Sequence, residues 1–156
     1  MKQTIIDEAT KRGFTVPQIA YILATVKHET NNTFKPVVEC YWMKDPDKWL
    51  RLHKTYYPYY GRGLVQITWK DNYRKFSNLL NVDLVNHPSL ALDPAISVDI
   101  LLTGFRDGLF TGKKLSDYIG GGSIDFTGAR RCINGTDKAR LIAGYASDYL
   151  KELQCK

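Results

Sequence analysis

Two glutamates, Glu29 and Glu39, are the residues whose type and spacing point most directly to chemistry. Glu29 ends an apolar, helix-like stretch, so its carboxyl is expected to be partly desolvated, which raises a carboxyl pKa. A continuous helix would separate the two residues by about 15 Å, but Asn31-Asn32 and Pro36 break the helical pattern and allow the chain to fold back. Two carboxyls facing each other across a cleft are what glycoside hydrolysis requires. A pair of ordinary surface acids is the alternative interpretation.

A tyrosine-rich and glycine-rich segment, residues 56–68, provides the second signal. Tyrosine rings offer flat apolar faces with a hydroxyl at one end, which suits contact with sugar rings. The glycines allow a ligand to approach the backbone closely, and Arg62, Gln66 and Thr68 add polar groups. A packed, tyrosine-rich loop without a ligand would have the same composition.

The sequence does not indicate a metal site, a cofactor or a disulfide framework. His28-Glu29 begins like a zinc-protease motif, but Asn32 stands where the second histidine would be needed. The cysteines are odd in number and widely spaced, which predicts free thiols at Cys40, Cys132 and Cys155.

The charge is uneven along the chain. There are 22 Lys and Arg against 16 Asp and Glu, a net charge of +6. Residues 1–78 carry 13 basic and 7 acidic side chains, whereas residues 79–156 carry 9 of each. A basic face suggests an anionic partner, or else serves solubility alone. Because no run of Lys and Arg exceeds two residues, we do not expect nucleic acid to be the partner.

The elements that must position these residues are mainly helices. Apolar periodicity and capping residues predict a mainly α fold with one catalytic domain over residues 1–156, a substrate cleft and a small hairpin or sheet. We expect a long loop region over residues 31–63 and a flexible link at Gly120–Gly122. The expected helices cover residues 2–12, 15–29, 68–80, 93–105 and 136–153, with Thr15, Thr68, Asp93 and Thr136 at their starts.

The N-terminal residues and the hydropathy favour a protein made in the cytoplasm. No apolar run approaches the roughly 20 residues that a bilayer requires. Acids occupy the N-terminal positions where a signal peptide would be apolar. We therefore expect synthesis without a signal peptide and no stable membrane insertion. We also expect a monomer.

Several short motifs, in a consistent order from residue 28 to about 145, resemble the family 19 glycoside hydrolases, which comprise lysozyme-like chitinases and related phage endolysins. The segment Tyr59-Tyr60-Gly61-Arg62-Gly63-x-x-Gln66-x-Thr68, followed by Asn72-Tyr73, is similar to the family signature. His28-Glu29-Thr30 resembles the motif that contains the family's general acid. Ile133-Asn134-Gly135 resembles a sugar-binding segment, and Arg140 resembles an arginine near the site.

The resemblance implies a lysozyme-like fold and, for the chitinases, an inverting mechanism. Two departures are visible: Thr136 replaces a second glycine, and Glu39 lies closer to Glu29 than the second glutamate of plant chitinases does. The Glu29–Glu39 spacing instead fits the endolysin pattern. The implied catalytic residues are Glu29 and Glu39, and the implied substrate-binding residues are Tyr60, Arg62, Gln66, Thr68, Asn72, Asn134 and Arg140.

The charge distribution indicates which substrate to expect. The basic half of the chain holds the expected cleft, and peptidoglycan is anionic whereas chitin is neutral. We therefore expect an endolysin-type muramidase that cleaves peptidoglycan and reaches the wall with the help of a separate pore-forming protein. A chitinase is the alternative enzyme, and a non-catalytic wall-binding module is the alternative of another class.

Overall fold

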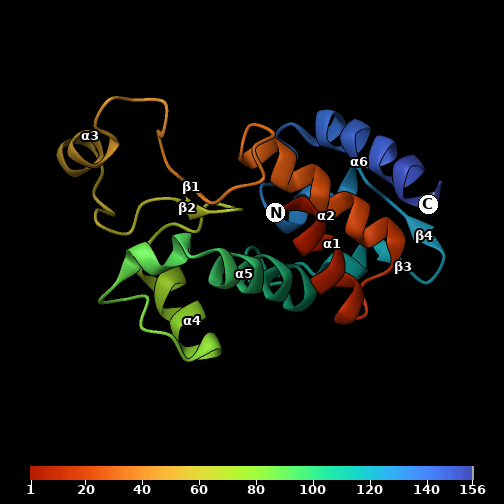
Figure 1. Ribbon diagram of the computed structural model, residues 1–156, viewed down its shortest axis with the longest axis horizontal. Coiled ribbons are helices and arrows are strands. Elements are labelled where there is room, and N and C mark those ends of the chain that lie inside the picture. Colours follow the sequence, from red (N-terminus) through yellow and green to blue (C-terminus); the bar gives the residue numbers. More distant parts are fainter. Residues whose placement is uncertain (156) are drawn as a thin grey trace. The chain divides into compact units, whose positions relative to one another are not determined.

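The computed structural model describes residues 1–155, and its fold is mainly α, as the sequence predicts (Figure 1). Within this range there are six α-helices, three short 3-10 helices and two two-stranded sheets. The chain forms two compact units: a first unit of Met1–Phe34 with Leu101–Lys156, and a second unit of Lys35–Ile100. A single catalytic domain over residues 1–156 stays a prediction.

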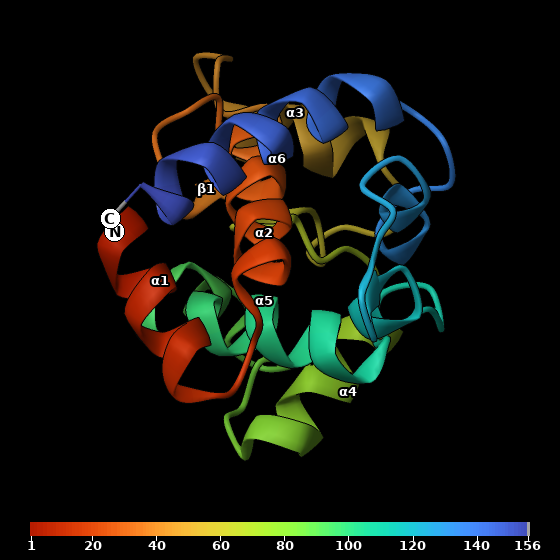
Figure 2. The same ribbon diagram turned by 90° about the vertical axis from the view of Figure 1, so that its right-hand side faces the viewer.

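The first unit is built around a buried helix. Helix α2 (Val16–Glu29) is buried from Ile19 to Val26 and packs against α6 (Ala139–Gln154) and α1 (Lys2–Lys11), as Figures 1 and 2 show. The apolar stripe predicted for the last helix is confirmed, since Ile142, Ala146 and Tyr149 are buried. An ion pair of 3.1 Å between Lys2 and Glu152 joins α1 to α6.

Helix α2 begins as its sequence predicts. The Thr15 hydroxyl accepts a hydrogen bond from the Gln18 N–H, and the Gln18 side chain accepts one from the Thr15 N–H, with Pro17 in the first turn. The Gln18 side chain also donates to the carbonyl of Ile119 at 2.8 Å. This start fixes the direction of the helix that ends at Glu29.

The rest of the first unit contains short elements. These are η2 (Leu115–Asp117), β3 (Ile119–Gly120), β4 (Ser123–Ile124) and η3 (Gly128–Cys132). Strands β3 and β4 are antiparallel, and Gly121 and Gly122 between them both have positive φ. The predicted flexible link at these glycines is therefore wrong: they form a tight hairpin turn, for which glycine is favoured because it adopts positive φ at no steric cost.

The second unit contains β1 (Val37–Val38), β2 (Arg62–Gly63), α3 (Pro46–His53), α4 (Lys70–Leu80) and η1 (Pro88–Leu92). It also contains the first half of α5 (Pro94–Asp107), which begins where Asp93 accepts a hydrogen bond from the Ile96 N–H, as predicted. Strands β1 and β2 are antiparallel, with Val37 opposite Gly63 and Val38 opposite Arg62.

Helix α3 corrects the prediction of a long loop over residues 31–63. It begins at Pro46, where the Asp45 side chain accepts a hydrogen bond from the Lys48 N–H. Leu50 is its buried residue, so no apolar periodicity marks it in the sequence. A short helix with one apolar anchor gives no repeating pattern to detect.

Two predicted helix caps are wrong. Helix α4 begins after Trp69, whose φ is 75°, and the Thr68 hydroxyl donates to the Gln66 carbonyl instead. Helix α6 begins after Lys138, whose φ is 59°, and Thr136 contributes its backbone carbonyl to the Ala139 N–H rather than its side chain. In both cases a left-handed residue turns the chain into the helix and takes the place of a side-chain cap.

Cys40, Cys132 and Cys155 are free thiols. Within residues 1–155, no helix combines the length and the apolar character needed to cross a membrane, and no cluster of three or more His, Cys, Asp or Glu could hold a metal ion.

Candidate active site

Glu29 is the last residue of α2, and its side chain is 19% exposed. Burial raises the pKa of its carboxyl above the usual range, while the positive charge of Arg130 acts in the opposite direction. The Nη1 atom of Arg130 lies 3.6 Å from Oε1 of Glu29. A carboxyl that retains its proton to higher pH than usual, yet faces a cation, is suited to act as a general acid.

Arg130 is the residue in contact with Glu29 that the sequence analysis did not single out. Its side chain is 2% exposed, and its Nε donates to the Asp137 carbonyl at 2.7 Å. Its own carbonyl accepts a hydrogen bond from the Asn134 N–H at 2.9 Å. The signal in the sequence was its place four residues before Asn134, in the segment that resembles a sugar-binding motif.

Asn134 and Arg140, the other two predicted residues of the first unit, have different surroundings. Asn134 follows η3, is exposed, and is tied through its backbone to Arg130 and thereby to Glu29. Arg140 is exposed in the first turn of α6, where it lines a surface depression with Arg131 and Lys138. The guanidinium that reaches Glu29 is therefore that of Arg130 and not that of Arg140.

Glu39 lies in the second unit, directly after β1, and its carboxylate is held at both oxygens. Oε1 accepts a hydrogen bond of 2.9 Å from the Gly61 N–H, and Oε2 accepts one from the Tyr56 hydroxyl. The backbone N–H of Glu39 donates to the Gly61 carbonyl at 2.7 Å. Burial, and then the bond to Glu39, raise the pKa of Tyr56, so Tyr56 remains a donor. These bonds hold the carboxyl group of Glu39 in one orientation.

Glycine is required at position 61 because the side chains of Gln66 and Glu39 approach the backbone closely there. A Cβ atom at this position would lie 2.7 Å from Oε1 of Gln66 and 3.3 Å from Oε1 of Glu39. The amide nitrogen of Gln66 donates to the Val37 carbonyl at 2.7 Å and to the Gly63 carbonyl at 3.2 Å. The structure therefore places Gln66 beside Glu39, held against both strands of the sheet.

Thr68 and Asn72 continue this hydrogen-bonded group. The Thr68 hydroxyl donates to the Gln66 carbonyl at 3.2 Å, and the Asn72 side chain donates to the Thr68 carbonyl at 2.7 Å. Gln66, Thr68 and Asn72 are all half-buried, so part of each side chain faces solvent. Gln66, Thr68 and Asn72 are thus linked by hydrogen bonds in the second unit, and Gln66 lies beside Glu39 where both side chains approach Gly61.

Tyr60 and Arg62, by contrast, lie inside the second unit. The Arg62 guanidinium stacks over the Tyr60 ring at 3.8 Å and donates to the Pro58 carbonyl and the Tyr73 hydroxyl, both at 2.9 Å. The Tyr60 hydroxyl donates to Asp47 at 3.0 Å. The interpretation of residues 56–68 as a packed loop therefore holds for Tyr60 and Arg62. Their buried side chains stabilise this segment through contacts with other protein groups.

Two exposed tryptophans that the sequence analysis did not single out are associated with Glu39. Trp69 contacts Tyr56, which binds Glu39, and Trp42 follows Glu39 by three residues. Trp69 is 55% exposed and meets the ring of Tyr56, the donor to Glu39, edge to face at 5.1 Å. Trp42 is 75% exposed and pairs with Tyr41 at 5.4 Å. Their rings offer the apolar faces that the sequence analysis assigned to the tyrosines of residues 56–68, of which Tyr60 is buried.

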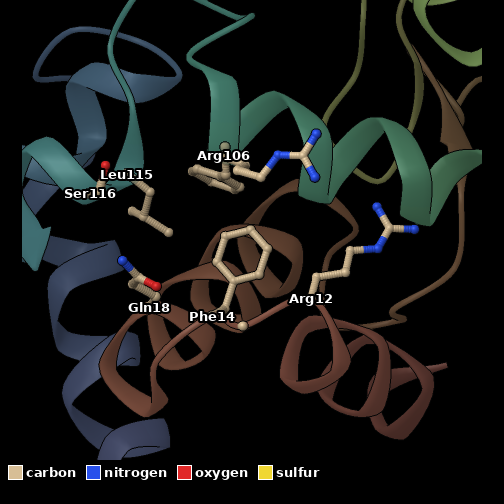
Figure 3. A pocket seen from close by; sticks show the side chains of 8 residues that line it. Arg12, Phe14, Gln18, Arg106, Leu115 and Ser116 are labelled. Atoms are coloured by element: carbon tan, nitrogen blue, oxygen red, sulfur yellow. The ribbon is translucent and has the colours of Figure 1, made fainter.

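A cavity of about 110 Å³ in the first unit contains none of the predicted residues (Figure 3). Its lining includes Phe14, whose ring lies between the side chains of Gln18 and Arg12 in the close-up, together with Arg106 and Leu115. The Arg12 side chain pairs with Glu8, and the Arg106 side chain pairs with Asp107, both at 3.0 Å. These cations are already neutralised, so the cavity offers no chemistry of its own.

Comparison with known proteins gives similarity to chitinases. No protein-family model matches the chain. Endochitinase 1 of Theobroma cacao is 32% identical over an alignment of 111 residues that covers 58% of this chain and 32% of that protein. Endochitinase A2 of Pisum sativum is 52% identical over 40 residues, 25% of this chain and 12% of that protein. The chain therefore spans about a third of the length of the cacao enzyme, and less of the pea enzyme.

Solved structures with a similar fold are also chitinases. A bacterial family 19 chitinase matches with a TM-score of 0.57 and 21% identity, covering 86% of this chain and 73% of that one. Chitinase C from Streptomyces griseus matches with a TM-score of 0.66 and 19% identity, covering 92% of this chain and 65% of that one. The protein is thus chitinase-like in sequence and has the mainly α fold of the family 19 chitinases.

Proposed function

We propose that this protein is a glycoside hydrolase that cleaves β-1,4 bonds between amino sugars, with Glu29 as the general acid and Glu39 as the general base. The observation that carries the proposal is the contrast between the two carboxyls. Burial raises the pKa of Glu29, whereas two donors hold the carboxylate of Glu39. An inverting glycosidase needs one carboxyl that donates a proton and a second carboxyl that is positioned to activate a water, and the buried Glu29 and the oriented Glu39 match these two needs.

The proposed reaction is a single displacement with inversion. Glu29 gives its proton to the leaving glycosidic oxygen as the bond to the anomeric carbon breaks. Glu39 takes a proton from the water that attacks that carbon from the opposite face. Such a reaction requires about 6.5–9.5 Å between the two carboxyls, and the proposal predicts that separation in the working enzyme.

The proposed sugar contacts come from the half-buried and exposed polar side chains. Gln66, Thr68 and Asn72 are linked by hydrogen bonds, and Gln66 lies beside Glu39. The backbone of Asn134 is bonded to Arg130, the partner of Glu29. Trp69 adds an exposed ring for stacking. Tyr60 and Arg62 act by supporting this surface, because their polar atoms bind other protein groups.

We propose peptidoglycan as the substrate, in an endolysin-type muramidase reaction. The net charge of +6 supports an anionic polymer over a neutral one. Chitin is the second candidate, and the names of the similar plant and bacterial chitinases favour it. A non-catalytic wall-binding module is disfavoured, because a module that only binds has no use for a carboxyl in dry surroundings next to Arg130.

Digestion of two substrates by the same preparation tests the proposal. Purified peptidoglycan and soluble N-acetylglucosamine oligomers are incubated with the protein and with its Glu29→Gln variant, and the products are identified by mass spectrometry. New reducing ends on N-acetylmuramic acid assign a muramidase, and cleavage of the oligomers alone assigns a chitinase. Binding of either polymer without cleavage would overturn the proposed enzyme.

A further inference from the structure

We infer that a basic depression at the start of α6 binds the carboxylates of the peptide chains attached to the peptidoglycan glycan strand. The depression has a volume of about 380 Å³, is open to solvent, and lies wholly in the first unit. Arg131, Lys138 and Arg140 line it, together with the hydroxyl-bearing Thr127 and Thr136. The inference rests on the proposed function, since it names the part of the substrate that this surface recognises.

The three cations are available to an external ligand. Within residues 1–155, the side chains of Arg131, Lys138 and Arg140 make no ion pair and no hydrogen bond, and all three residues are exposed. By contrast, Arg12, Arg106 and Arg130 of the same unit are each paired with a carboxylate. Residues 127–141 contain four basic side chains and one acid, Asp137, which does not line the depression.

The folded arrangement concentrates charge that the linear sequence does not show. Residues 79–156 have no net charge, yet the first unit as folded carries 13 Lys and Arg against 9 Asp and Glu, a net charge of +4. No side chain of the described residues caps the N-terminus of α6, so the positive end of its dipole adds to the same field.

The backbone that carries Arg131 is held in place. The Thr111 hydroxyl donates to the carbonyl of Arg131 at 2.6 Å and to that of Cys132 at 3.1 Å. Arg130 and Arg131 are neighbours in η3 with opposite exposure: Arg130 is buried against Glu29, and Arg131 is exposed at the depression. The depression is therefore adjacent, through one peptide unit, to the residue that contacts the proposed general acid.

Carboxylates on a flexible peptide match this surface. Arginine recognises carboxylates with paired donors, and several cations spread over an open surface suit an extended chain that bears several acids. Phosphodiesters of polymers attached to the wall would offer similar charge. The compact, buried donors typical of a dedicated phosphate site are not among the groups that line the depression.

The test removes two charges that have no role in the proposed catalysis. The double variant Arg131→Gln/Lys138→Asn keeps a residue that tolerates positive φ at position 138. The matched control, Lys11→Gln/Lys151→Gln, removes two exposed charges from the same unit away from the depression. Both are assayed on peptidoglycan stripped of attached phosphate polymers, on the same material with its carboxyls amidated, and on neutral N-acetylglucosamine oligomers.

We expect the double variant to raise KM for stripped peptidoglycan by about three- to tenfold with kcat unchanged, because the lost contacts are exposed ion pairs. Its rates on the neutral oligomers, and all rates of the control variant, should match the unchanged protein. Amidated peptidoglycan should show the same weakening with the unchanged protein, and 0.5 M salt should remove the difference.

Sedimentation binding of the Glu29→Gln variant, with and without the two charge substitutions, separates this inference from the proposed function. If the protein cleaves neither polymer, the proposed function fails, and binding to stripped peptidoglycan still decides the inference. Three outcomes would overturn the inference about the depression. The first is equal binding with and without the two charges, and the second is an equal loss of activity on charged and neutral substrates. The third is a charge effect that is seen only on walls that retain phosphate polymers.

Discussion

The Nη1 atom of Arg130 lies 3.6 Å from Oε1 of Glu29, and both side chains are withdrawn from solvent, with exposed fractions of 2% and 19%. Two opposing effects act on Glu29 at this contact. Burial favours the protonated carboxyl, and the guanidinium favours the carboxylate. The balance falls on the side of a raised pKa, which is the condition for a proton donor near neutral pH.

Replacing Glu29 by Gln should abolish most of the activity while preserving the fold. The amide keeps the shape of the side chain but cannot deliver a proton, and general acid catalysis contributes about 10²–10⁴-fold. The measurement is the initial rate of glycan cleavage, with circular dichroism and thermal unfolding as controls of folding. A variant that retains a third of the original rate would remove Glu29 from the mechanism.

Replacing Arg130 by Met should shift the pH profile rather than only lower its height. Loss of the guanidinium removes the effect that lowers the pKa of Glu29, so the pKa rises further and the alkaline limb of the profile moves to higher pH. Arg130→Lys keeps the charge and should shift the limb less. Parallel profiles for all three proteins would show that Arg130 has a structural role alone.

The raised pKa of Glu29 also predicts a pH dependence of stability. The folded state binds this proton more tightly than the unfolded state, so the contribution is complete below the unfolded pKa, near 4.5, and is lost as pH rises through the folded pKa. The free energy of unfolding of the unchanged protein should therefore fall, relative to that of Glu29→Gln, as pH increases from about 4 to 8. Urea unfolding at several pH values measures this difference, and a constant difference would contradict it.

Replacing Glu39 by Gln should remove the acid limb of the pH profile. A general base must be ionised, so activity normally declines as pH falls through its pKa, and an amide has no such titration. The rate should fall by about 10²–10⁴-fold, while the Tyr56 and Gly61 donors retain an oxygen to bind. If Glu39→Gln is nearly as active as the unchanged protein, the base must be sought at Asp45, at Asp47 or in a water held by Thr68.

Replacing Gly61 by Ala should impair catalysis more than it impairs folding. The added Cβ would lie 2.7 Å from Oε1 of Gln66, so Gln66 must turn away from Val37 and Glu39 must shift. Overpacking of this kind costs about 1–3 kcal/mol. Gly144→Ala is the matched control, because a Cβ in α6 at that position meets no atom within 4 Å. Equal activity of the two variants would show that the close approach at Gly61 is not needed.

Much of the helical framework could be predicted from the sequence because its signals are local. The capping pair of Thr15 and Gln18, the turn at Asp93-Pro94 and the apolar stripe of the last helix each involve residues within one or two helical turns. Glu29 could be proposed as an acid for the same reason, since its place at the end of an apolar helix predicts burial.

The surroundings of the proposed catalytic residues were decided by tertiary structure. Glu39 is held by Tyr56 and Gly61, 17 and 22 positions away, and Gln66 is held by Val37, 29 positions away. Arg130 reaches Glu29 from a segment that no local pattern connects to α2. Hydrophobic periodicity and capping residues indicate which residues share one helix. The contacts of Glu39, Gln66 and Arg130 depend instead on which distant segments pack together, and no single segment of the sequence determines the energy of that packing.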